Sequence, residues 1–293
     1  MILVTGANGQ LGRRIVQHLI AREPALLGGR LAISVRDPAR AGDLARRGVL
    51  VRQGDFGQPE TLAAAFAGAE RLVLVSTDGP RDVRIAQHRN AIRAAREAGV
   101  RHILYTSFMD ADAAAPTELA IVHKDTEATL ADSGMDHTIL RNTLYADDLC
   151  LLVTPELQQD VLRLPAGDGA VSLVSRNELA QAIAAAAQAP RLDKRIYTLT
   201  GQSSASYADI AARIARVSGK PLAYQHVTLD DYVGSLVAAG IPAWFAAALG
   251  DMFRCVAEGR FAATTCDFAA LVGHPPKSLD CLIHEFYAPR NPS

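Results

Sequence analysis

The first twelve residues, MILVTGANGQLG (1–12), combine a short apolar run with three evenly spaced glycines. Residues 2–4 (ILV) are typical of a buried strand. Gly6, Gly9 and Gly12 follow at intervals of three, and the segment after them carries apolar side chains at helical spacing. A strand, a glycine-rich turn and a helix in this order predict a turn that binds the pyrophosphate of a dinucleotide.

Such a turn needs glycine because the backbone has to approach the phosphates closely, where a Cβ atom would be in the way. The N–H groups of the first helical turn then face the phosphates. The residues that we expect to contact the cofactor here are Gly6, Asn8, Gly9, Gln10, Leu11 and Gly12. The alternative is a tight turn that binds nothing.

Strands and helices alternate after this turn. Further strands are predicted at 30–35, 49–53, 71–76, 101–107 and 135–141, with helices between them. This alternation is typical of a parallel, doubly wound α/β sheet of Rossmann type. Ligands of such sheets lie at the carboxyl ends of the strands. The polar residues that we expect near the cofactor for this reason are Ser76, Thr77, Thr106 and Ser107.

The end of the second strand carries the residues that select the cofactor. A carboxylate here would bind the ribose 2′-hydroxyl of NAD, whereas an arginine can pair with the 2′-phosphate of NADP. Arg36 ends this strand and Arg40 follows closely, so the sequence predicts NADP(H). Asp37 leaves NAD open, because a strand that ended one residue later would bring its carboxylate to the ribose.

A Gly54-Asp55 pair follows the third strand, and its role has two interpretations. Such a pair commonly lies beside the adenine, which makes Asp55 and Phe56 candidate cofactor contacts. Asp55 could instead cap the helix that we expect to begin near Pro59. The two interpretations carry equal weight.

Composition narrows the classes of partner. The chain has 293 residues, of which 30 are Lys or Arg and 31 are Asp or Glu, for a net charge of −1. This balance gives no electrostatic reason to expect nucleic acid or an anionic membrane as partner. The chain enters its first strand at once and has no apolar stretch of membrane-spanning length, so we expect a cytoplasmic protein without a signal or transit peptide. The 4 cysteines lack metal-binding spacing, so we expect reduced thiols and no metal site.

From Thr143 onwards the regular alternation stops. We expect a Rossmann domain over 1–148 and a smaller α+β substrate domain over 149–293 that closes over the nicotinamide end of the cofactor. Residues 176–200 should pack back on the main sheet as a helix and a strand. The other elements predicted in this part are helices at 207–218, 229–239, 242–258 and 278–287 and a strand at 222–227.

Several segments resemble the NmrA-like branch of the atypical short-chain dehydrogenases/reductases, and in particular its NADPH-dependent quinone reductase and triphenylmethane reductase members. They are TGANGQLG (5–12), SVRDPARA (34–41), GVLVRQGDF (48–56), AAREAGVRHILYTS (94–107), ADSGMDHTILRNTLYADD (131–148) and LVGHP (271–275). The resemblance implies a Rossmann domain with a smaller substrate domain and an NADPH-type cofactor without flavin. It also implies that the three glycines meet the pyrophosphate, that Arg36 meets the 2′-phosphate, and that Asn142 and Tyr145 line the substrate pocket.

One departure concerns the acid catalyst. Standard short-chain dehydrogenases use a Tyr-x-x-x-Lys pair on the helix after the fifth strand, in which the Lys lowers the pKa of the proton-donating Tyr. Here that helix reads TELAIVHKDTEATL (117–130) and holds no tyrosine. By alignment to the branch, Leu119 and His123 occupy the two positions, and Lys124 is one residue out of register, about 100° around the helix. We expect His123 to bind a ribose hydroxyl; the alternative is a partly buried histidine bonded to a backbone carbonyl.

Two functions of different classes follow. The first is an enzyme that transfers a hydride from NADPH directly to a quinone or similar conjugated acceptor, with His123, Asn142 and Tyr145 as its catalytic site. The second is a dinucleotide sensor that acts through a protein partner, since NmrA-like proteins include members that bind the cofactor without turnover. An epimerase or alcohol dehydrogenase ranks lowest because the tyrosine is missing. The helix at 81–98 offers either a homodimer face or a cover for the sheet.

Overall fold

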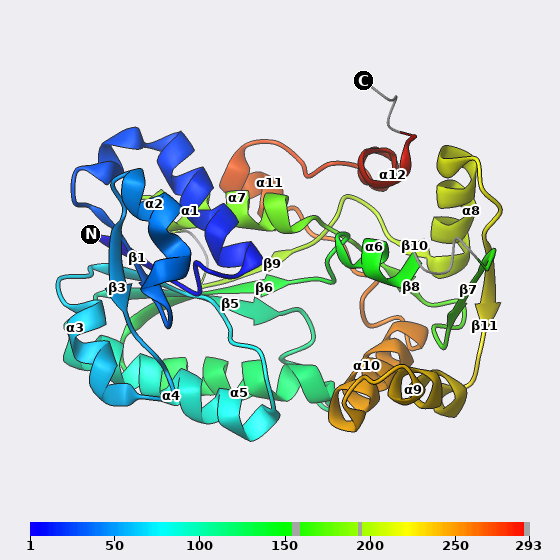
Figure 1. The fold of residues 1–293 in the computed structure, drawn as a ribbon, viewed down its shortest axis with the longest axis horizontal. Coiled ribbons are helices and arrows are strands. Elements are labelled where there is room, and N and C mark those ends of the chain that lie inside the picture. Colours follow the sequence, from blue (N-terminus) through cyan, green and yellow to red (C-terminus); the bar gives the residue numbers. More distant parts are fainter. Residues whose placement is uncertain (154–158, 193–194, 290–293) are drawn as a thin grey trace.

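The fold is built on a seven-stranded parallel sheet (Figure 1). The computed structural model describes residues 1–153, 159–192 and 195–289. From one edge to the other the sheet consists of β3 (Leu50–Gln53), β2 (Leu31–Val35), β1 (Ile2–Thr5), β4 (Arg71–Leu74), β5 (His102–Phe108), β6 (Asp136–Asn142) and β9 (Ile196–Leu199). The strand order reverses between β1 and β4, which confirms the doubly wound Rossmann-type fold.

Helices cover both faces of this sheet (Figure 1). One face carries α1 (Gln10–Arg22), α2 (Gly42–Arg46), α7 (Arg176–Gln188) and α11 (Asp267–Val272). The other carries α3 (Leu62–Phe66), α4 (Arg81–Glu97) and α5 (Glu118–Asp132). Short 3-10 turns occupy Pro24–Leu27, Pro38–Ala41 and Pro59–Thr61. The strands and long helices for which bounds are given above are confirmed to within two residues at their ends. α11, with six residues, is too short to show a helical period and was missed, and the short strands after Thr143 were not located.

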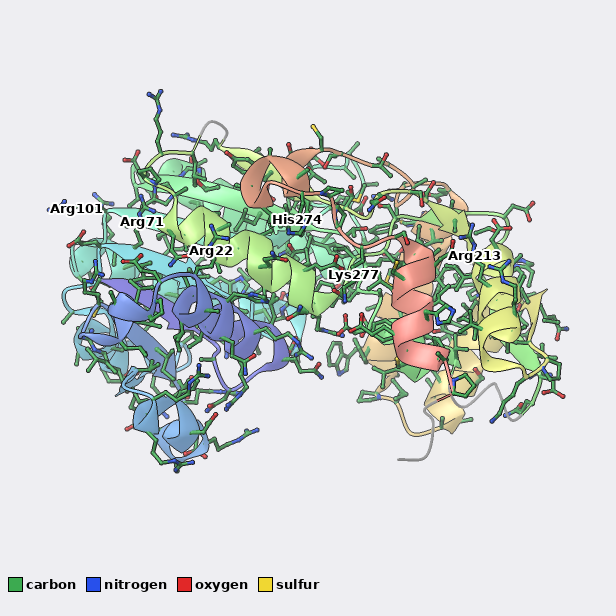
Figure 2. The ribbon with its side chains drawn as sticks, turned by 90° about the horizontal axis from the view of Figure 1, so that it is seen from above. Arg22, Arg71, Arg101, Arg213, His274 and Lys277 are labelled. Atoms are coloured by element: carbon green, nitrogen blue, oxygen red, sulfur yellow. The ribbon has the colours of Figure 1, made fainter. Side chains whose placement is uncertain are left out.

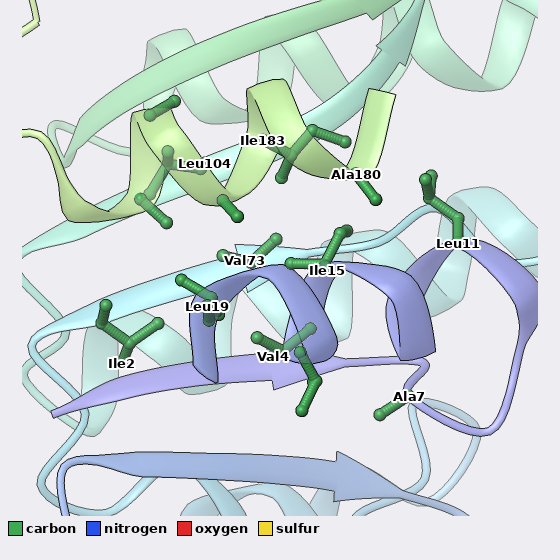
Figure 3. Close-up of a cluster of buried hydrophobic side chains, with 14 of the residues drawn as sticks. Ile2, Val4, Ala7, Leu11, Ile15, Leu19, Val73, Leu104, Ala180 and Ile183 are labelled. Carbon is green, nitrogen blue, oxygen red and sulfur yellow. The ribbon is translucent and has the colours of Figure 1, made fainter. Parts of the chain in front are cut away.

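The core on one face of the sheet forms where α1 and α7 pack against each other (Figure 3). Ile15 and Leu19 of α1 meet Ile183 of α7 above Val4 and Val73 of the sheet. The buried side of α7 is otherwise mostly alanine, and these small side chains let the two helices approach closely. This packing holds the helix that follows the glycine turn firmly on the sheet.

The remaining elements gather beside the carboxyl ends of the strands (Figure 1). They are α6 (Asp148–Val153), β7 (Val161–Leu164), β8 (Ala170–Val171), β10 (Ala205–Ser206), α8 (Tyr207–Ser218), β11 (Ala223–His226), α9 (Leu229–Ala238), α10 (Ala243–Ala257) and α12 (Leu279–Tyr287). They share a hydrophobic core of their own, with Phe253 and Phe261 fully buried at its centre. This confirms a smaller α+β part after the Rossmann sheet, while the boundary between 148 and 149 stays a prediction.

Two elements from the second half of the chain, β9 and α7, contact the Rossmann part. β9 pairs in parallel with β6, from Ile139 opposite Ile196 to Asn142 opposite Leu199. α7 packs on α1, on one face of the sheet.

Within the described residues, no helix combines the length and the apolar composition that crossing a membrane requires.

A buried capping box starts α7. The Ser175 hydroxyl caps the Glu178 N–H, and the Glu178 carboxylate in turn accepts the Ser175 N–H at 3.3 Å. Glu178 is only 4% exposed and also accepts the N–H of Lys277, which lies in the segment between α11 and α12 (Figure 2). The cap therefore joins the start of α7 to a segment a hundred residues further along the chain.

We predict that Ser175→Ala lowers the free energy of unfolding by about 2 kcal/mol, the upper end of the range for a lost N-cap, because it also leaves the buried Glu178 carboxylate short of a partner. Ser206→Ala is the matched control, since Ser206 caps α8 through an exposed box with Asp209 and should cost about 0.5–1 kcal/mol. Urea unfolding of both variants measures the difference. Equal losses would show that burial of Glu178 adds nothing.

Candidate functional site

The turn between β1 and α1 holds its three glycines for three different reasons. Gly6 has φ +65°, in the left-handed region that favours glycine. A Cβ atom on Gly12 would lie 2.4 Å from the Gly6 carbonyl oxygen, so α1 can pack on the turn only without it. A Cβ atom on Gly9 would lie 3.2 Å from the same oxygen, a contact that a small shift relieves. Folding therefore requires Gly6 and Gly12 more strictly than Gly9, and the contact of Gly9 with a pyrophosphate stays a prediction.

The start of α1 can receive a phosphate. Gly9 is its N-cap, and no side chain caps the helix, so the N–H groups of its first turn remain available as donors. Asn8 ties this turn to the end of β2, because its Nδ2 donates to the Asp37 carbonyl at 2.8 Å. The Asn8 Oδ1 is buried, and no described residue forms a hydrogen bond with it. These features fit the pyrophosphate of a dinucleotide.

The residues expected to select the cofactor lie at the end of β2. Arg36 and Arg40 are both exposed. The Asp37 carboxylate accepts the Ala39 N–H at 3.1 Å and so caps the 3-10 turn that follows. A carboxylate used as a cap is less free to bind a ribose, which favours Arg36 over Asp37 as the selecting residue.

The Asp55 carboxylate forms a local turn. Its Oδ1 accepts the Gly57 N–H at 2.9 Å, and its own N–H donates to Thr61 Oγ1 at 2.9 Å. The 3-10 turn at Pro59–Thr61 begins without a side-chain cap, so the interpretation of Asp55 as a helix cap is wrong. Phe56 is buried against the sheet. As adenine contacts, Asp55 and Phe56 stay predictions.

Side chains from three other elements accept the backbone N–H groups of the segment that follows β4. The sequence predicted this strand over 71–76, but it ends at Leu74. The next three N–H groups find side-chain acceptors in place of strand partners: Val75 donates to Thr5 Oγ1 (2.9 Å), Ser76 to Thr106 Oγ1 (2.9 Å) and Thr77 to His88 Nε2 (3.0 Å). Ser107, by contrast, donates to Glu127 at 2.6 Å, next to the Arg141–Glu127 ion pair. As cofactor contacts, Ser76, Thr77, Thr106 and Ser107 stay predictions.

Behind this segment lies a buried polar cluster formed by Arg84, His88, Tyr105 and His123. Tyr105 is fully buried in β5, and its hydroxyl lies 2.9 Å from His123 Nδ1. Arg84 Nη2 donates to Ser76 Oγ at 2.9 Å and lies 3.4 Å from His123 Nε2. The partners of His123 are thus side chains, and the interpretation of a backbone carbonyl partner is wrong. Its role at a ribose stays a prediction that these contacts do not favour.

The two histidines of this cluster are neutral at pH 7. Burial, and then the Arg84 charge, lower the pKa of His88 to about 3 and hold the pKa of His123 well below its usual range. His88 Nε2 accepts the Thr77 N–H, so its Nδ1 carries the proton, which it donates to Thr126 Oγ1 at 2.8 Å. A guanidinium is only a donor, so His123 likewise carries its proton on Nδ1. Burial raises the pKa of Tyr105, the opposite of what an acid catalyst needs.

Asn142 and Tyr145 lie where β6 ends. Asn142 is 1% exposed, and neither its amide oxygen nor its amide nitrogen has a hydrogen-bond partner among the described residues. Burial raises the pKa of the Tyr145 phenol, and the neighbouring Asn142 amide offsets part of that rise. The Arg176 guanidinium stacks over the Tyr145 ring at 4.4 Å and pairs with Asp148 at 2.7 Å. An unpaired buried amide costs about 1–3 kcal/mol, so a polar ligand group that satisfied it would bind well.

Sequence reasoning missed Arg84, His88 and Tyr105. A signal was present in α4, because Arg84 and His88 share the helix face of Ala91 and Ala95, which are buried. Polar residues on a buried helix face indicate an internal network. Lys124, which is out of register for the missing pair, is exposed and donates to the Ala113 carbonyl at 3.1 Å.

Comparison with known proteins matches residues 6–190 to a family model described as NAD(P)H-binding. The chain belongs to this NAD(P)H-binding family. It is 36% identical over 279 residues to quinone oxidoreductase 2 of Escherichia coli K12, covering 95% of this chain and 96% of that protein. It is 27% identical, over 95% of both chains, to an NAD(P)H azoreductase of Xenophilus azovorans.

Solved structures agree. The structure of E. coli quinone oxidoreductase 2 with NADPH superimposes with a TM-score of 0.92 at 34% identity, covering 98% of this chain and 100% of that one. The Citrobacter sp. triphenylmethane reductase with NADP(H) gives 0.90 at 33% identity, covering 98% and 100%. The resemblance to these reductases and the NADP(H)-type cofactor inferred from the sequence are confirmed, and this member of the NAD(P)H-binding family is an NAD(P)H-dependent oxidoreductase.

We predict that Gly9→Val loses NADPH binding while the protein stays folded, because the branched side chain occupies the approach to the phosphates. Gly12→Val is the contrast, since its Cβ atom meets the turn backbone and should lower the melting temperature sharply. Fluorescence titration with NADPH and a thermal melt of each variant separate the two effects. NADPH binding retained by Gly9→Val would mean that the pyrophosphate lies elsewhere.

We predict tighter binding of NADPH than of NADH, by about tenfold or more, because Arg36 can donate charge-assisted hydrogen bonds to the 2′-phosphate. Arg36→Ala should remove this preference, whereas Asp37→Ala should leave NADH affinity unchanged. Titration of each variant with both reduced cofactors measures this. A loss of NADH affinity in Asp37→Ala would identify Asp37 as the selecting residue.

Proposed function

We propose that this chain reduces a quinone or a similarly conjugated acceptor by direct hydride transfer, without flavin and without a Tyr–Lys acid catalyst. The supporting observation is the Asn142 amide, which is buried beside Tyr145 at the end of β6 without a hydrogen-bond partner among the described residues, in a chain whose expected acid position holds Leu119. The similarity to quinone oxidoreductase 2 and triphenylmethane reductase agrees with this chemistry.

The cofactor would be held by the glycine turn, by the first turn of α1 and by Arg36. NADPH supplies the hydride when bound. The chain's own part is to bring the acceptor ring into position, and Asn142 and Tyr145 would do this with an amide and an aromatic ring. His123 would act indirectly, since its ring nitrogens face Tyr105 and Arg84.

The missing acid limits the acceptors. An ordinary ketone becomes an alkoxide on reduction, a strong base that needs a proton during the transfer. A quinone becomes a hydroxyphenolate, whose conjugate acid resembles tyrosine with a pKa of about 10, so water can protonate it afterwards. Burial raises the pKa of both Tyr105 and Tyr145, whereas a Tyr–Lys pair lowers the pKa of its phenol. The site therefore suits acceptors whose reduced form is a stabilised anion.

We predict that purified, flavin-free protein oxidises NADPH in the presence of a benzoquinone and shows negligible reduction of cyclohexanone. Asn142→Ala should lower kcat/KM for the quinone by about 5- to 30-fold, because it removes a positioning contact worth about 1–2 kcal/mol. NADPH affinity of this variant should stay unchanged. The absorbance of reduced nicotinamide follows turnover, and fluorescence titration follows binding.

Two results would contradict this proposal. Cyclohexanone turned over as fast as benzoquinone would reveal an acid catalyst. Tight NADPH binding with no quinone turnover above the buffer rate would favour the alternative inferred from the sequence, a dinucleotide sensor that acts through a protein partner.

A further inference from the structure

Arg84 is a buried cation that forms no ion pair with a described carboxylate. It lies in the first turn of α4 and is 9% exposed. Its Nη2 donates to Ser76 Oγ and approaches His123, while its Nε is buried and has no partner in the described part of the chain. Its Nη1 makes no hydrogen bond within the described residues and is not fully buried. The guanidinium therefore has N–H donors at Nη1, which is its accessible end, without acceptors among the described residues.

The groups around Arg84 do not neutralise it. His88 and His123 are neutral, because burial and the Arg84 charge depress their pKa values, and Tyr105 stays a phenol. Asp78, the one carboxylate among the described residues that acts on Arg84 electrostatically, is exposed and forms no ion pair with it. Burying a cation without an anion is unfavourable unless a ligand completes the arrangement.

The position of Arg84 relates it to the candidate site. Its partner Ser76 follows β4 at the carboxyl edge of the sheet. Arg84 is also within electrostatic range of the Tyr145 phenol, which follows β6 at that same edge. Arg84 therefore reaches this edge from α4, on one face of the sheet, whereas Arg176 stacks on Tyr145 from α7, on the other face.

We propose that Arg84 stabilises the negative charge that forms on the acceptor oxygen during reduction, by donating a hydrogen bond from Nη1 to that oxygen. The proposal rests on the quinone reductase function proposed above. A hydride brings two electrons and one hydrogen to the quinone, which becomes a hydroxyphenolate monoanion. One proton from water then completes the hydroquinone. Arg84 gains and loses no proton, since a guanidinium stays charged in proteins.

This role replaces what the missing pair would do. A Tyr–Lys pair neutralises the developing oxyanion by proton transfer, whereas a fixed guanidinium stabilises it electrostatically, in an environment with little water to screen the interaction. Such stabilisation suffices for a delocalised phenolate but not for an alkoxide. Arg84 would then be a catalytic residue, and His123 and Ser76 would be positioning residues that orient its guanidinium.

The first test compares Arg84→Met, Arg84→Lys and the control Arg81→Met in single-turnover oxidation of NADPH by benzoquinone. Arg81 is exposed on the same helix and pairs with Asp82 and Glu118, so its loss should change the rate less than twofold. Loss of an oxyanion donor typically lowers the rate by about 10²–10³-fold, which we expect for Arg84→Met, with partial recovery in Arg84→Lys. The NADPH dissociation constant should stay within about twofold in all variants.

The second test needs no turnover. 4-Nitrophenol changes colour on ionisation, so its absorbance reports its protonation when it binds to the NADP⁺ complex in place of a hydroquinone. The wild-type protein should lower the pKa of the bound phenol by about one to three units, the effect of a neighbouring cation. Arg84→Met should abolish this shift, Arg84→Lys should retain part of it, and Arg81→Met should leave it intact.

The outcomes separate the two proposals. If Arg84→Met keeps the quinone turnover and the phenol pKa shift of the wild type, the role of Arg84 is overturned. The proposed function would still stand. Absence of quinone turnover in the wild type would overturn both. If Arg84→Met does not fold, the wild-type phenol titration and Arg84→Lys still decide, because an unshifted phenol pKa in the wild-type complex contradicts the proposal by itself.

Discussion

The site depends on how β4 leaves the sheet. A strand that ends inside a parallel sheet must give its remaining N–H groups other partners, since burying them unpaired is costly. Here Thr5, Thr106 and His88 accept the three N–H groups that follow Leu74. These acceptors come from β1, β5 and α4, and they fix the chain at the point where the strand order reverses. In doubly wound sheets this is the point at which a dinucleotide binds.

The same interaction explains why a histidine lies deep in a hydrophobic layer. His88 must present an unprotonated nitrogen to Thr77, and burial keeps it neutral down to a pKa of about 3. Arg84, one helical turn earlier, reinforces that neutrality. The charge of Arg84 and the neutrality of His88 therefore support each other. The role proposed for Arg84 uses this unneutralised positive charge at the acceptor oxygen.

The sequence predicted the fold almost completely, because each strand and long helix carries its own period and each boundary has a local cause. Gly219 illustrates this: its φ of +69° ends α8 where the glycine had predicted the end. α11 was not predicted because its six residues are too few to show a helical period. The glycine turn was predicted equally well. Only the structure shows that packing requires a glycine at position 12 and does not require one at position 9.

The candidate site was less readable because its polar groups meet through tertiary contacts. The sequence shows that α5 lacks the catalytic tyrosine. It did not predict that Tyr105, which lies on β5 and is fully buried, places its phenol next to His123. That phenol cannot replace the missing acid. It is fully buried, burial raises its pKa, and the proton on His123 Nδ1 already binds its oxygen. What distinguishes this site from a Tyr–Lys site is therefore the kind of charge it provides: a fixed guanidinium surrounded by neutral groups, which can hold an anion but cannot protonate one.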